Sequence, residues 1–190
     1  MGEVKWISAY AAGEGEALVL QQAQVKKWDS PALLGAIFQG KSEREKDLSN
    51  RTAAWFQNQF LPGDQALGEE KSLYKANLAP LDRANVTGIL LAGRWLRIFA
   101  FGNAPTRVYR VREAFGKMRV TLMNPDEYGV FEAEEGTVLI LAPENWLEHF
   151  GEETLLNCFG REDLTEESAA KSLQELSEQA GGSAIFLACK

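Results

Sequence analysis

The side chains that most often carry hydrolytic or metal chemistry are scarce in this chain of 190 residues. It contains one histidine, His149, and two cysteines, Cys158 and Cys189. These are too few for a cysteine-rich zinc site. A Ser-His-Asp hydrolase would depend on His149 alone, and no Gly-x-Ser-x-Gly turn accompanies it. The sequence therefore argues against both chemistries, and we expect the two thiols to be buried and reduced.

One segment matches a nucleotide-binding pattern to the letter. Residues 35–42 read Gly-Ala-Ile-Phe-Gln-Gly-Lys-Ser, which satisfies G-x-x-x-x-G-K-[ST]. In a genuine phosphate-binding loop Lys41 would reach the terminal phosphates and Ser42 would hold Mg²⁺. The strand before this loop would be very short, however, and the loop would expose Ile37 and Phe38. A P-loop nucleotide-binding protein is therefore the less favoured alternative.

Charge is unevenly distributed along the chain, whose formal net charge is −7. Residues 94–119 carry seven basic side chains and one acidic one, whereas residues 126–178 carry fifteen acidic and two basic ones. Three arginines of the basic stretch are candidate binding residues: Arg107, Arg110 and Arg112. They suit a protein partner that is acidic or phosphorylated, because arginine pairs bidentately with carboxylate and phosphate. The alternative is that they only balance the chain's own acidic helices.

The charge and hydropathy of the chain also limit which partners and which cell compartment are expected. An acidic chain is unsuited to general nucleic-acid binding, which requires a basic face. No stretch approaches the ~20 apolar residues that span a bilayer, and the N-terminus lacks the pattern of a secretion signal. We therefore expect a cytoplasmic protein without a nucleic-acid or membrane partner.

Apolar periodicity predicts the elements that position these residues. Helices are predicted at 44–61, 65–79, 145–159 and from the N-cap Thr165 to Gly181. Strands are predicted at 4–10, 17–25, 32–38, 86–91, 96–101, 106–112, 119–123, 129–133, 138–142 and 184–189. Turn residues predict hairpins between the first two strands, between 86–91 and 96–101, and between 129–133 and 138–142. Hairpins outnumber alternating βα units, so we expect an α+β fold with antiparallel sheets in one domain spanning 1–190.

The same patterns predict which side chains form the core. Five residues of the predicted helices and strands are assigned to it: Trp55, Phe56, Phe99, Ile140 and Leu173.

Four segments follow one another in an order that is typical of one enzyme family. Residues 36–41 read Ala-Ile-Phe-Gln-Gly-Lys, and residues 102–109 read Gly-Asn-Ala-Pro-Thr-Arg-Val-Tyr. Residues 142–145 read Ala-Pro-Glu-Asn, and residues 181–187 read Gly-Gly-Ser-Ala-Ile-Phe-Leu. In this order they resemble motifs of the metal-dependent protein Ser/Thr phosphatases, the PPM or type 2C family. The resemblance implies a four-layer αββα sandwich, in which two antiparallel sheets are flanked by helix pairs.

In that family, acidic residues at strand ends hold two Mg²⁺ or Mn²⁺ ions, because two close dications need several carboxylates. The matching metal positions in this sequence are Glu16, Gln39, Gly40, Glu144 and Gly182. Gln39 stands where the bridging Asp is expected, and Gly182 stands where the last Asp is expected. The arginine that positions phosphate is missing from residues 10–15. What remains would coordinate two dications poorly.

The resemblance and these departures together predict a PPM-like domain that has lost its metal centre. Such a pseudophosphatase would act as a binding or regulatory module, with no identifiable catalytic residue. The alternative is a weakly active protein Ser/Thr phosphatase. A cofactor, Mg²⁺ or Mn²⁺, is expected only in that case.

Overall fold

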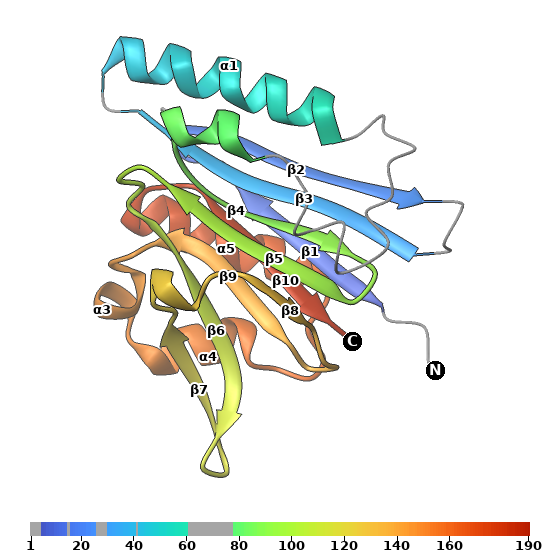
Figure 1. Cartoon of the computed structure of the whole chain (residues 1–190). Helices are drawn as coiled ribbons and strands as arrows, with labels where there is room; N and C mark the ends of the chain where they lie inside the picture. Colours follow the sequence, from blue (N-terminus) through green and yellow to red (C-terminus); the bar gives the residue numbers. More distant parts are fainter. Residues whose placement is uncertain (1–4, 15, 26–29, 41, 61–77) are drawn as a thin grey trace. The chain divides into compact units, whose positions relative to one another are not determined.

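The computed structural model describes residues 5–14, 16–25, 30–40, 42–60 and 78–190 (Figure 1). The chain separates into two compact units, each of which contains one five-stranded antiparallel sheet. Unit 1 comprises residues 1–14, 105–125 and 134–190, and unit 2 comprises residues 15–104 and 126–133. The expectation that residues 1–190 form one domain stays a prediction.

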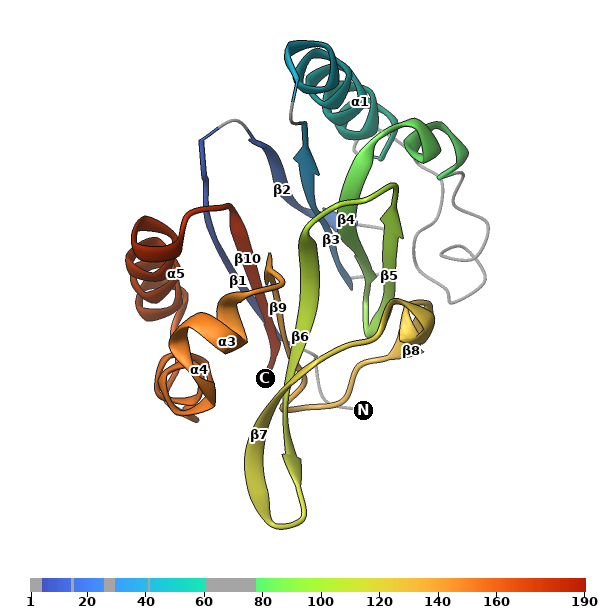
Figure 2. The same cartoon turned by 90° about the vertical axis from the view of Figure 1, so that its left-hand side faces the viewer.

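Unit 1 has a sheet in which the first and last strands of the chain are neighbours. In spatial order its strands are β1 (Trp6–Ala11), β10 (Ala184–Cys189), β9 (Val138–Pro143), β6 (Thr106–Ala114) and β7 (Lys117–Leu122). Three helices gather on one face of this sheet (Figure 2): α3 (Trp146–Phe150), α4 (Glu152–Phe159) and α5 (Glu166–Ala180).

The helical stripe of α5 explains how it packs against this sheet. Ala169, Leu173 and Leu176 follow one another at helical spacing, and all three are buried in the same cluster as Ile140 of β9. Phe159 of α4 stacks on Phe186 of β10 with ring centroids 5.5 Å apart. The prediction that Ile140 and Leu173 are core residues is confirmed.

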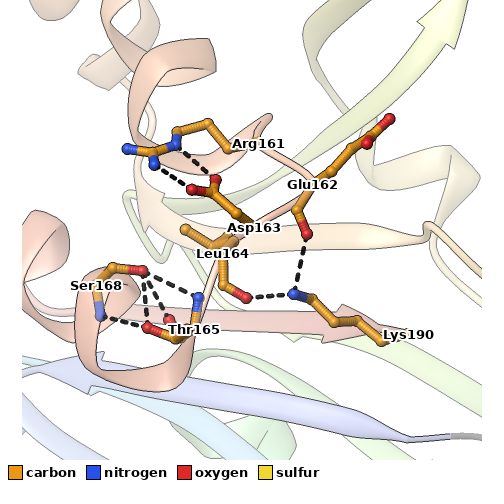
Figure 3. A network of polar contacts seen from close by, with 7 residues as sticks. All are labelled: Arg161, Glu162, Asp163, Leu164, Thr165, Ser168 and Lys190. Atoms are coloured by element: carbon orange, nitrogen blue, oxygen red, sulfur yellow. Dashed lines mark hydrogen bonds and ion pairs between the residues drawn. The ribbon is translucent and has the colours of Figure 1, made fainter.

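Both ends of α5 lie where the sequence predicts them. The Thr165 side chain accepts a hydrogen bond from the Ser168 N–H at 3.2 Å, and Gly181 follows the last turn with a φ of +76°. Lys190 Nζ donates hydrogen bonds to the carbonyls of Glu162 and Leu164 (Figure 3). These contacts tie the α4–α5 loop to the end of β10.

Unit 2 has a sheet with the strand order β2 (Glu16–Val25), β3 (Ser30–Gln39), β4 (Asn85–Ala92), β5 (Trp95–Phe101) and β8 (Val130–Glu132). Helix α1 (Glu43–Phe60) contacts β2 and β3, and the short helix η1 (Ala79–Arg83) contacts β4 and β5. A second short helix, η2 (Pro125–Glu127), follows β7. The predicted core residue Phe99 is buried in this unit, which confirms its assignment.

The predicted fold class, α+β with two antiparallel sheets, is confirmed, but two predicted hairpins are wrong. Strand β1 pairs with β10 and β2 pairs with β3, so the first two strands belong to different sheets. Strand β8 pairs with β5, whereas β9 pairs with β6 and β10, so these two strands do not form a hairpin either. The hairpin of β4 and β5 is confirmed.

The helix predictions need one correction. The helix predicted at 145–159 is two helices, α3 and α4, because Gly151 between them has a φ of +78°. The helix predicted at 65–79 falls almost wholly outside the described residues. The side chains of Trp55 and Phe56 also lie outside the described part of the chain. No described helix is long and apolar enough to cross a membrane.

Candidate functional site

Two of the predicted metal positions are direct neighbours in unit 2. Glu16 begins β2 and Gln39 ends β3, and the two residues are partners in the antiparallel register. Gln39 Nε2 donates a hydrogen bond of 2.6 Å to Glu16 Oε1. Gln39 is buried, with 8% of its surface exposed, and its carbonyl accepts a hydrogen bond of 3.0 Å from Ser49 Oγ on α1. The carboxylate of Glu16 therefore accepts a hydrogen bond from an amide group of the chain itself.

Gly40 lies where the chain turns from β3 into α1. A Cβ atom at this position would lie 2.5 Å from the Lys46 nitrogen and 2.6 Å from the Glu45 carbonyl carbon. These atoms belong to the helix backbone and cannot move aside. The close approach of α1 thus requires a glycine at position 40, independently of any role at a metal site.

The structure also explains the apparent P-loop and excludes it. Residues 35–39 are extended and pair with β2 on one side and β4 on the other, so their backbone N–H groups are not gathered around a phosphate. Ser42 and Glu45 instead form a capping box, in which Ser42 Oγ accepts from the Glu45 N–H and Glu45 Oε2 accepts from the Ser42 N–H. The motif marks the start of α1, and the P-loop alternative is wrong.

The two remaining metal positions lie in unit 1. Glu144 follows the end of β9, is exposed, and forms an ion pair of 3.5 Å with Arg107. Gly182 precedes β10 with a φ of +85°, and a Cβ atom there would lie 2.4 Å from Pro143 Cγ. An aspartate at position 182 would therefore be strained and would require Pro143 to shift.

Tyr109 has a structural role beside this position that the sequence analysis did not assign. Its hydroxyl donates a hydrogen bond of 2.7 Å to the Pro143 carbonyl and joins β6 to the end of β9. Burial raises the pKa of the Tyr109 hydroxyl above its ordinary value, while hydrogen bonds from the backbone at Leu147 and Trp146 oppose this change. The tyrosine of the Gly-x-x-x-x-Arg-x-Tyr segment thus anchors the turn that carries Glu144.

The residues at these positions do not fit a pair of metal ions. One acid, Glu16, is bonded to Gln39, and the other, Glu144, is paired with Arg107. The remaining three positions offer one amide, Gln39, and two glycines without space for a side chain, Gly40 and Gly182. Among the described residues, no group of three or more His, Cys, Asp or Glu side chains is placed to hold a metal ion. We therefore derive no reaction step through a metal centre.

The other predicted binding residues, Arg110 and Arg112, lie on β6 together with Arg107. Val111 between them is buried, so alternation places Arg110 and Arg112 on the same face. Arg107 is half-buried and engaged with Glu144, whereas Arg112 is exposed. The three arginines therefore differ in how far they are available to a partner.

The comparisons with known proteins give a fold. No protein-family model matches the sequence, and no curated protein matches it. Among solved structures, a serine/threonine phosphatase of S. agalactiae matches with a TM-score of 0.65 at 12% identity, over 98% of both chains. PppA, a key regulatory component of T6SS in Pseudomonas aeruginosa, matches with a TM-score of 0.57 at 9% identity, over 100% of this chain and 99% of PppA.

A third match contains metal. The catalytic domain of the serine threonine protein phosphatase PstP, in complex with two manganese ions, has a TM-score of 0.52 at 17% identity over 98% of both chains. The chain thus has the fold of the PPM phosphatases over nearly its whole length, and the resemblance seen in the sequence is confirmed at the level of fold. At these identities the likeness does not extend to activity.

Proposed function

We propose that this chain is a pseudophosphatase: a PPM-type domain that does not hold a binuclear metal centre and that serves as a binding or regulatory module. The observation that carries the proposal is the hydrogen bond between Gln39 and Glu16. It puts an amide donor against the acid that, by the resemblance, would face a cation.

Two further features support the proposal. Gly182 cannot regain a carboxylate without moving Pro143, and Glu144 is balanced by Arg107. Since a dication site needs several oxygen ligands with negative charge, two acids that are each already engaged by another side chain are not enough. A module that is selected for binding would retain the fold without needing the metal ligands, and this is the combination proposed here.

The experiment that tests the proposal is calorimetry with Mn²⁺, together with hydrolysis of para-nitrophenyl phosphate in the presence of Mn²⁺. We expect no saturable binding of Mn²⁺ and no hydrolysis above the rate in buffer. A Glu144→Ala variant is the matched control, because it removes an exposed acid at a metal position.

The alternative, a weakly active Mn²⁺- or Mg²⁺-dependent protein Ser/Thr phosphatase, is the outcome that would overturn the proposal. Solved structures with this fold include PstP with two manganese ions and RsbX with magnesium. Hydrolysis that depends on Mn²⁺ and is lost in the Glu144→Ala variant would establish that alternative.

The proposal includes a partner and a compartment. The partner is a protein that presents acidic or phosphorylated side chains, since the basic stretch of residues 94–119 contrasts with the chain's overall charge of −7. The compartment is the cytoplasm, because the two cysteines, Cys158 and Cys189, are both free thiols. PppA, which shares the fold, is a regulatory component.

A further inference from the structure

The hairpin of β6 and β7 in unit 1 continues past the strand that supports it. Strand β6 pairs with β9 only as far as Val111, but it pairs with β7 as far as Ala114. Residues 112–119 therefore form a two-stranded extension that pairs with no third strand of the described residues, visible as the yellow-green hairpin that projects from the sheet of unit 1 (Figures 1 and 2). We call residues 110–121 the β6–β7 ribbon.

One face of the ribbon is basic. In the register of β6 and β7, Arg112 lies opposite Arg119, Ala114 lies opposite Lys117, and Arg110 lies opposite Thr121. Because cross-strand partners share a face and alternate residues return to it, these positions lie on the same face. Four of the six carry a cation and none carries an acid. A cluster of this kind is unfavourable by itself, since like charges directly opposite each other repel.

Most of this charge is not balanced by the chain. Arg119 is paired with Glu152 of α4 at 2.9 Å. Among the described residues, no acidic side chain forms an ion pair with Arg110, Arg112 or Lys117. The one acid of the ribbon, Glu113, is the cross-strand partner of Met118 and so lies on the opposite face. The face that carries Arg110, Arg112 and Lys117 is therefore a basic surface with no ion pair to these three cations from the described part of the chain.

The turn of the ribbon carries an apolar side chain that is exposed rather than packed in the core of its unit. Phe115 is fully exposed and has a φ of +53°, and Gly116 after it has a φ of +74°. A two-residue turn with both φ angles positive favours Asn or Asp before Gly, because a side chain such as Phe is strained there. The strained backbone at Phe115 thus lowers the stability of the turn, and its side chain is not buried against the described residues in compensation.

We infer that the β6–β7 ribbon is a docking surface for an acidic segment of a partner polypeptide, whose carboxylates or phosphorylated side chains contact the basic face while Phe115 enters an apolar part of the partner. The inference rests on the proposed function for the class of partner, but not on the absence of a metal centre.

The contact is made through side chains rather than by adding a strand to β7. The outward N–H of Val120, in the middle of the edge strand β7, already donates to Glu152 Oε1 at 3.0 Å. This carboxylate occupies the edge where an added strand would pair. The net charge of −7 opposes the approach of a long polyanion such as nucleic acid or of an anionic membrane, whereas a short acidic segment meets only the ribbon.

The test uses short fluorescein-labelled peptides with the full chain and fluorescence anisotropy as the readout. One peptide alternates Glu with Leu and Phe, a second replaces Glu by phosphoserine, and a third replaces Glu by Lys. We expect binding of the first two and not of the third, with an affinity that falls as salt is added. The first two peptides separate carboxylate from phosphate as the preferred anion.

Charge reversal on the ribbon is compared with an equal change elsewhere. Arg112→Glu with Lys117→Glu is expected to weaken peptide binding about tenfold or more. The control, Arg44→Glu with Lys171→Glu, makes the same change in net charge at exposed helix positions and is expected to leave binding unchanged. Phe115→Asn should also weaken binding while its thermal midpoint does not fall, because Asn suits the turn.

Three results would overturn the inference: no binding of either acidic peptide, equal binding by the ribbon variants and the parent, or tighter ribbon-dependent binding of duplex DNA or phosphatidylserine vesicles than of the peptides. Phe115→Asn keeps the test decisive if charge reversal disturbs folding. Mn²⁺-dependent phosphatase activity would contradict the proposed function but leave this inference standing.

Discussion

The contact between Glu16 and Gln39 joins the start of β2 to the end of β3 through their side chains. An amide and a carboxylate at 2.6 Å satisfy each other as donor and acceptor. Two carboxylates at the same positions would repel each other and would need a cation or a proton between them. The chemistry of this pair is thus decided by a single donor group, the Nε2 amide of Gln39.

A Gln39→Glu variant tests this interpretation at the scale of the residue. It should lower the free energy of unfolding by about 1–3 kcal/mol at pH 7, because a buried hydrogen bond is replaced by two facing carboxylates. Their repulsion raises the pKa of the pair in the folded state, so the lost stability returns as the pH falls and one carboxyl takes up a proton. Thermal midpoints at pH 7 and at about pH 4 measure both effects.

The double variant Glu16→Gln with Gln39→Glu is the matched control. It exchanges the two groups and restores the amide–carboxylate bond, so it should recover most of the stability at pH 7. A single Gln39→Glu variant that is as stable as the parent at pH 7 would contradict the interpretation.

At the scale of the residue, the sequence predicted which residue types stand at the metal positions, but it did not predict the contacts that these residues make. The resemblance was sufficient to place Gln39 and Gly182 at metal positions. That Gln39 bonds to Glu16 depends on the register of β2 and β3, and that Gly182 lacks space depends on Pro143. Phe115 had a signal in the sequence, since Phe-Gly stands between two strands where Asn-Gly is usual, but its exposure had to be seen in the structure.

At the scale of the element, Glu152 joins the first turn of α4 to the edge strand β7. Its two oxygens accept from the Val120 N–H at 3.0 Å and from Arg119 Nη1 at 2.9 Å. These hydrogen bonds, the one from the Val120 backbone first, lower the pKa of the Glu152 carboxyl from its ordinary value of 4.5. The charged form is therefore the one that holds the helix against the strand.

This lowered pKa predicts a pH dependence for a Glu152→Gln variant. A carboxyl whose pKa is depressed by folding contributes stability above its unfolded pKa and loses it as the pH falls through the folded value. The parent should have the higher thermal midpoint at pH 7, and the two proteins should converge as the pH falls through the lowered pKa of the Glu152 carboxyl.

Glu153→Gln is the control for this measurement, because the neighbouring Glu153 is exposed and forms no ion pair with the described residues. It should match the parent at every pH. A midpoint difference between parent and Glu152→Gln that is the same at pH 7 and at low pH would show that charge is not the cause.

Elements were predicted well where local signals decide them, and poorly where pairing is long-range. The helix α1, the caps of α5 and the β4–β5 turn are all decided by local signals, and all are confirmed. The wrong hairpins, by contrast, joined strands that are adjacent in sequence. Strand β1 pairs with β10 at the other end of the chain, and no turn residue signals such a partner.

At the scale of the whole molecule, the expectation of a single domain predicts that both units unfold together, in one cooperative transition. Leu173 is fully buried in unit 1, and Leu173→Ala should cost about 2–5 kcal/mol. If residues 1–190 unfold as one domain, amides of β4 in unit 2 and of β10 in unit 1 should lose the same amount of protection against hydrogen exchange.

Glu175→Ala is the control, since Glu175 lies on the exposed side of the same helix. It should leave the protection of both strands close to that of the parent. Loss of protection in β10 alone would mean that the two units unfold separately, and the single-domain expectation would then be wrong.

Under the proposed function, the bond between Gln39 and Glu16 has a consequence for how the domain depends on the supply of metal ions. A site built around dissociable ions is filled in proportion to the free ion concentration, so the population of its ordered state follows supply by mass action. An amide that is part of the chain is always present at full occupancy. A signalling module built on such a contact would keep the same binding surface in metal-starved and metal-replete cells, which an ion-dependent relative cannot do.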